Sequence, residues 1–180
     1  MRTFICIDFP LEIEKEIERI QKIILKKKFT GKITESDNLH LTLKFLGEIS
    51  QEKLEEVKIE LGKVQFEELN LALGQVGAFA HNNMPRIVWI KILGAYKLQS
   101  QIDNALIDMF PKEARFMSHV TLARVKYVKD KKDFIDYVNQ IKPMKLKFKI
   151  PGFKLKESKL NPSDPEYITL EEYFADNHLK

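Results

Sequence analysis

Apolar residues occupy every second position between residues 39 and 45. This alternation predicts a β-strand whose apolar side faces a core. The intervening residues would share the other side of the strand: His40, Thr42 and Lys44. The strand would therefore present a histidine and a threonine together on a rigid support.

The same pattern returns between residues 115 and 125. His119 and Thr121 stand two positions apart within an apolar run, 79 positions (119 minus 40) after the first pair. The two contexts are His-Leu-Thr-Leu and His-Val-Thr-Leu, and they hold two of the four histidines of the chain. One such motif is common in structural strands, but two matched copies favour a shared site.

The apolar and polar positions in the rest of the chain predict an order of elements that occurs twice: strand, helix, His-x-Thr strand, helix and strand. The first copy covers residues 2–79 and the second 86–157, with a final strand at 166–173. Residues 31–37 are expected to form a turn, and residues 77–85, with two asparagines and a proline, a boundary between lobes. The chain is thus predicted to be a single domain, residues 1–180, whose two lobes bring the His-x-Thr strands together in a central cleft.

Composition narrows the class of protein. With 180 residues and 44% hydrophobic content, the chain can bury a sizeable core. Cys6 is the single cysteine, which excludes a disulfide framework and a cysteine-based zinc cage. Asp8 and Pro10 interrupt the amino-terminal region too early for a secretory signal, and no apolar run approaches the roughly 18 residues of a membrane span. A cytoplasmic protein without a membrane partner is expected.

The net charge of +4 permits a polyanionic ligand without demonstrating one. One lysine-rich tract stands out near the carboxyl end: Lys145, Lys147, Lys149, Lys154, Lys156 and Lys159. Such a face is usually only solvated. If it bordered the cleft, it would follow a nucleic-acid backbone.

Two histidines suit acid–base chemistry because the unperturbed imidazole pKa lies near 6.5. A neutral histidine can accept a proton from an attacking water while a protonated one donates to a departing oxygen. The threonine hydroxyls can donate to phosphate oxygens as their charge shifts. This combination favours phosphoester cleavage without a metal.

A zinc site is the competing use of two histidines, and it needs at least a third ligand. No His, Asp or Glu lies three or four positions after His40 or His119. His81 falls in the expected boundary loop and His178 in the tail, where solvated side chains are the default. No metal and no cofactor are expected.

Arg124 lies five residues after His119, so an ideal strand would direct it to the opposite face. An ion pair there is one interpretation, and a bulge that returns the guanidinium to a phosphate is the other. Three aromatic side chains could stack on an RNA base but are expected in the core: Phe45, Trp89 and Tyr127.

These stretches resemble the two-histidine phosphoesterase superfamily, and within it the bacterial and archaeal RNA 2′,3′-cyclic phosphodiesterases, also called 2′-5′ RNA ligases. The resemblance covers nearly the whole chain. It rests on Arg-Thr-Phe-Ile-Cys-Ile-Asp-Phe-Pro, His-Leu-Thr-Leu-Lys-Phe-Leu-Gly, Pro-Arg-Ile-Val-Trp and His-Val-Thr-Leu-Ala-Arg-Val. Ser118 departs from the proline that often precedes the second histidine in the family, a change that removes no catalytic group.

The resemblance implies an α+β fold of two lobes related by a pseudo-two-fold axis. Each lobe would be an antiparallel sheet with outer helices, and the two would enclose a central cleft. It further implies that His40 is the proton donor and His119 the proton acceptor. Thr42 and Thr121 would hold phosphate oxygens, and Arg124 would contact the phosphate.

The predicted activity is metal-independent hydrolysis of a terminal RNA 2′,3′-cyclic phosphate to a 2′-phosphate, with 2′-5′ RNA ligation by the same chemistry. The expected partners are RNA ends with a cyclic phosphate, for example transfer-RNA fragments, and the expected state is a monomer. A non-catalytic RNA- or nucleotide-binding module using the same cleft is the alternative. The sequence does not identify the natural RNA.

Overall fold

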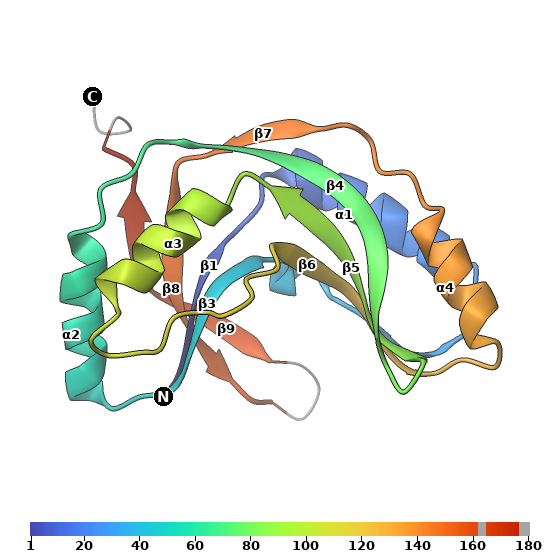
Figure 1. Ribbon diagram of the computed structural model, residues 1–180, viewed down its shortest axis with the longest axis horizontal. Coiled ribbons are helices and arrows are strands. Elements are labelled where there is room, and N and C mark those ends of the chain that lie inside the picture. Colours follow the sequence, from blue (N-terminus) through green and yellow to red (C-terminus); the bar gives the residue numbers. More distant parts are fainter. Residues whose placement is uncertain (162–164, 177–180) are drawn as a thin grey trace.

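Two antiparallel sheets form the framework of the computed structural model, which describes residues 1–161 and 165–176 (Figure 1). The four-stranded sheet has the order β3 (Leu41–Glu48), β1 (Arg2–Ile7), β8 (Gly152–Lys159), β9 (Glu166–Phe174). The five-stranded sheet has the order β2 (Thr30–Ile33), β6 (His119–Tyr127), β5 (Met84–Leu93), β4 (Leu69–His81), β7 (Lys147–Ile150). Together with the helices these sheets confirm the predicted α+β fold class.

The α-helices divide between the two sheets (Figure 1). The pair α1 (Leu11–Ile24) and α4 (Lys131–Asn139) packs on the five-stranded sheet. The pair α2 (Gln51–Gly62) and α3 (Tyr96–Ala105) packs on the four-stranded sheet. A short 3-10 turn, Ser36–Asn38, precedes β3. Within the described residues, none of the helices has the length and apolar character needed to cross a membrane.

Local sequence explains where the helices begin and which faces they bury. The apolar positions of α1 repeat at helical spacing and are completely buried: Ile13, Ile17, Ile20 and Ile24. Pro10 stands at the N-cap position of α1, as its fixed φ favours. Ser50 caps α2, because its side chain accepts a hydrogen bond from the backbone N–H of Lys53.

The predicted lobe boundary at residues 77–85 is wrong. These residues belong to β4, β5 and the hairpin turn between them, all within the five-stranded sheet. Asn82 and Asn83 have φ values of 50° and 62°, the left-handed backbone that a tight two-residue hairpin requires and that asparagine tolerates. The two asparagines that suggested a boundary between lobes therefore form the turn of a hairpin within one sheet.

The strands of each sheet come from both halves of the chain. β8 and β9 join β1 and β3, whereas β4 joins β5 and β6. The repeats at 2–79 and 86–157 stay a prediction about the order of elements. The predicted turn at 31–37 is also partly wrong, because Thr30–Ile33 forms the edge strand β2 against β6.

Candidate active site

A bulge in β3 sets the side chains that face the cleft. Cys6 pairs with Thr42 and Ile5 with Lys44, so Leu43 is an extra residue on β3. A bulge shifts the alternation by one position. Lys44 consequently turns inward and is 4% exposed, while Phe45 turns outward and is 68% exposed. The predictions that Lys44 shares the face of His40 and that Phe45 lies in the core are both wrong.

β6 has a bulge at the same place in its motif. Trp89 pairs with Thr121 and Val88 with Ala123, which leaves Leu122 as the extra residue. The shift returns Arg124 to the side of the strand that carries His119 and Thr121. The structure thus contains the bulge that one of the two interpretations of Arg124 requires, and the contact with a phosphate stays a prediction. Arg124 and Phe45 occupy equivalent positions of the two motifs.

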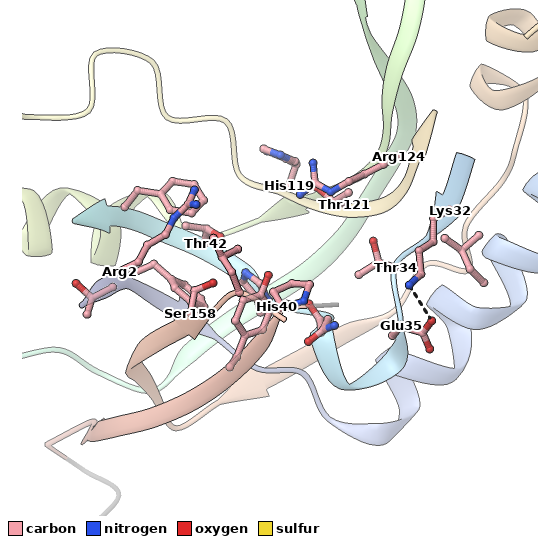
Figure 2. A pocket seen from close by; sticks show the side chains of 18 of the residues that line it. Arg2, Lys32, Thr34, Glu35, His40, Thr42, His119, Thr121, Arg124 and Ser158 are labelled. Carbon is pink, nitrogen blue, oxygen red and sulfur yellow. Dashed lines mark hydrogen bonds and ion pairs between the residues drawn. The ribbon is translucent and has the colours of Figure 1, made fainter. Parts of the chain in front are cut away.

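A cleft of about 460 Å³ lies between the two sheets and collects the predicted side chains (Figure 2). Four of its lining residues come from the two His-x-Thr motifs: His40, Thr42, His119 and Thr121. Arg124 lines the same cleft and makes no hydrogen bond or ion pair with the residues that the structure describes. Sequence reasoning missed further polar lining residues: Arg2, Lys32, Thr34, Ser158 and Tyr167. Arg2 opens one of the stretches that carry the family resemblance, but no motif indicates that any of these side chains faces the cleft, and the packing of the strands reveals them.

Each imidazole is oriented by a hydrogen bond to the backbone carbonyl two residues earlier in the chain. Nδ1 of His40 lies 2.8 Å from the carbonyl oxygen of Asn38, and Nδ1 of His119 lies 2.6 Å from that of Met117. A carbonyl only accepts hydrogen bonds, so Nδ1–H is the donor in both rings. Proton transfer to or from a substrate would then use Nε2, which accepts a proton when the ring is neutral and donates one when the ring is protonated.

Aromatic rings support each histidine. The His40 ring lies 5.0 Å from Phe4 and 5.1 Å from Tyr167, between ring centroids. The His119 ring lies 5.1 Å from Phe79, which in turn packs against Trp89. The contacts of Tyr167 with His40 and of Phe79 with His119 are edge-to-face, and packing of this kind restricts the rotation of an imidazole. Trp89 is buried as predicted, whereas the prediction for Tyr127 is wrong, because its side chain is exposed.

Burial lowers the pKa of His40 to about 4, and the nearby cations Lys156 and Arg124 act in the same direction. The Asn38 carbonyl and Asp8 oppose this shift. In the free protein His40 is therefore neutral near pH 7. A bound phosphate would favour the imidazolium and raise this pKa.

We expect the stability of the free protein to rise with pH between about 4 and 6.5 because of His40. In this window the unfolded chain binds a proton at His40 and the folded chain does not, so folding releases it. The contribution is up to about 3 kcal/mol. Urea unfolding at several pH values measures it, with His40→Gln as the control. An equally steep rise in that variant would contradict the expectation.

The lysine tract does not border the cleft. Lys156 and Lys154 form ion pairs with Asp8 at 2.6 and 3.2 Å, and Lys154 also contacts Glu172. Lys149 lies on β7 of the other sheet, where it contacts Glu68. The tract is therefore divided between the sheets and partly neutralised by carboxylates.

His81 is not among the residues that line the cleft. His81 ends β4 and is exposed, and His178 lies outside the described residues. In the part of the chain that the structure describes, no group of three His, Cys, Asp or Glu side chains could hold a metal ion.

A family model for LigT-like phosphoesterases matches residues 7–89 and 94–167. The chain belongs to this family. An RNA 2′,3′-cyclic phosphodiesterase of Methanocaldococcus jannaschii is 34% identical over 181 residues, which is 96% of this chain and 100% of the relative. A protein of the same name from Thermotoga maritima is 32% identical, over 96% of this chain and 94% of its own.

A solved LigT-like phosphoesterase shares the fold. The crystal structure of Escherichia coli LigT complexed with 3′-AMP matches with a TM-score of 0.78 and 25% identity. The match covers 97% of this chain and 98% of the other. The two-sheet architecture of this chain is thus that of a LigT-like protein.

Proposed function

We propose that this protein hydrolyses terminal RNA 2′,3′-cyclic phosphates to 2′-phosphates. The observation that carries the proposal is the position of His40 and His119, which come from different sheets and line one cleft. In both rings Nδ1 is hydrogen-bonded to a backbone carbonyl. The names of the relatives from M. jannaschii and T. maritima support the same activity. The E. coli relative binds 3′-AMP, which carries its phosphate on the ribose edge that a cyclic phosphate also occupies.

In the proposed mechanism, neutral His119 accepts a proton from water through Nε2 while the water oxygen attacks phosphorus. The bond from phosphorus to the 3′ oxygen breaks in line, and protonated His40 donates a proton to that oxygen. The products are a 2′-phosphate and a free 3′-hydroxyl. Thr42, Thr121 and Arg124 would stabilise the charge that develops on the other phosphate oxygens.

The acid role of His40 requires that it be protonated in the substrate complex. Its low pKa in the free protein means that substrate binding and protonation are coupled. The anionic phosphate would place negative charge beside the imidazole and so favour its protonated form. Proton uptake on binding of adenosine 2′-monophosphate follows from this coupling.

The same chemistry would join RNA ends. If the 5′-hydroxyl of a second RNA replaces water, attack on the cyclic phosphate forms a 2′-5′ phosphodiester and again releases the 3′-hydroxyl. Ligation and hydrolysis would then be two outcomes of one site. Phe45, which is exposed in the cleft, offers a surface on which the terminal base could stack.

Incubation of the pure protein with an oligonucleotide that ends in a 2′,3′-cyclic phosphate tests the proposal. The expected product carries phosphate on the 2′ oxygen, and separation of the 2′ and 3′ isomers identifies it. Binding of the oligonucleotide without turnover would favour the alternative of a non-catalytic RNA-binding module.

We expect prolonged chelation with EDTA to leave the rate of hydrolysis unchanged. The proposed proton transfers and charge stabilisation use only side chains of the cleft. The measurement compares kcat before and after chelation in metal-free buffer. Loss of activity that is restored by a divalent metal ion would overturn the metal-independent mechanism.

A further inference from the structure

Arg2 is a cation of the cleft that the proposed mechanism does not use. It begins β1 and lines the cleft together with Ser158 of β8 (Figure 2). Glu48 stands opposite Arg2 in the strand register, but the two form no ion pair. Within residues 1–161 and 165–176, Arg2 makes no hydrogen bond or ion pair.

Arg2 is displaced along β1 from Phe4, the residue whose ring contacts His40. Phe4, whose ring is 5.0 Å from that of His40, is two residues further along β1 on the same face. Two strand residues span about 7 Å. Arg124 instead comes from β6 beside His119 and Thr121. The cleft thus has two guanidinium groups from different sheets, one beside the histidine motifs and one displaced along β1.

Two hydroxyl groups accompany Arg2. Ser158 and Tyr167 are paired residues of β8 and β9, and both line the cleft. Neither hydroxyl makes a hydrogen bond with the part of the chain that the structure describes. Burial raises the pKa of Tyr167 while Arg124 and Arg2 act against the shift, so its hydroxyl lies within the electrostatic field of both guanidinium groups. A guanidinium with neighbouring hydroxyls is a donor set that suits phosphate oxygens.

We infer that Arg2, Ser158 and Tyr167 form a second phosphate subsite, which holds the phosphodiester on the 5′ side of the terminal nucleotide. The inference rests on the proposed function, because it assumes that the cyclic phosphate lies between the histidines. In an RNA end, one ribose separates the cyclic phosphate from the 5′ phosphodiester. The displacement of Arg2 along β1 from Phe4, the ring neighbour of His40, is about 7 Å and matches this arrangement. The subsite makes the cleft selective for RNA ends over free cyclic nucleotides, which lack the second phosphate.

Isothermal calorimetry with two product analogues tests the subsite without relying on turnover. Adenosine 2′-monophosphate carries only the first phosphate, and adenosine 2′,5′-bisphosphate carries both. At fixed ionic strength we expect the bisphosphate to bind about tenfold more tightly, as one charge-assisted contact predicts. Arg2→Gln should remove this advantage, and Arg2→Lys should keep part of it. Arg86→Gln is the matched control, since Arg86 is exposed, lies outside the cleft and has the same charge.

Two outcomes would overturn the subsite. One is equal binding of the two nucleotides by the unaltered protein, and the other is an equal loss for both nucleotides in Arg2→Gln. A thermal melt of each variant excludes unfolding as the cause. Turnover of a cyclic phosphate without any advantage from a 5′ phosphate would reject the subsite and leave the proposed function standing. A bisphosphate advantage without turnover would reject the proposed function and leave the subsite standing.

Discussion

Replacing His119 by alanine is expected to lower kcat for an RNA 2′,3′-cyclic phosphate by about 100-fold to 10,000-fold. The variant loses the group that accepts a proton from water, and this is the usual contribution of one general base. His40→Ala is expected to lose a similar factor, because the departing 3′ oxygen is then no longer protonated. The double variant should be little worse than either single one, since the two histidines act in one step.

The matched control is His81→Ala. His81 is exposed at the end of β4 and does not line the cleft, so its removal should leave kcat unchanged. Circular dichroism of each variant checks that the fold is intact. Retention of full activity by His40→Ala or His119→Ala would contradict the proposed mechanism.

Replacing Lys44 by alanine is expected to lower the free energy of unfolding by about 3–5 kcal/mol. Lys44 and Asp103 form an ion pair whose side chains are 4% and 6% exposed. Lys44 also donates to the carbonyl of Pro111, while Asp103 accepts from Gln99 and from the backbone N–H of Glu113. Removal of the lysine leaves a buried carboxylate without its cation, and the network that connects β3, α3 and the loop after α3 is broken.

Urea unfolding at neutral pH measures this loss. The double variant Lys44→Met/Asp103→Leu should recover much of it, because it leaves neither charge buried. Lys132→Ala is the control, since the ion pair of Lys132 with Asp136 on α4 is exposed and should contribute little to the free energy of unfolding. A loss below about 1 kcal/mol in Lys44→Ala would show that the carboxylate is accommodated without the lysine.

Sequence patterns were informative about features that depend on a single strand or helix, such as which of its side chains are buried and which share a face. The isoleucine spacing of α1 predicted its buried face, and the alternation around His40 and His119 predicted strands that place each threonine with its histidine. Asn82 and Asn83 misled the interpretation, because the same residues favour a linker and a tight hairpin turn. Residues 30–33 carried too little apolar character to indicate an edge strand.

The sequence by itself determined the main helices and strands and the two pairs of histidine and threonine, because these follow from periodicity and from side-chain chemistry, whereas the α+β class was implied by the resemblance of its motifs to a known family. Only the tertiary structure decided which residues join those pairs. The bulges at Leu43 and Leu122 turn Lys44 into the core and Arg124 into the cleft, and they arise from the pairing of each strand with its neighbour. Arg2, Ser158 and Tyr167 reach the cleft because β8 and β9, from the end of the chain, pair beside β1 from its beginning. Local periodicity contains no information about such pairing.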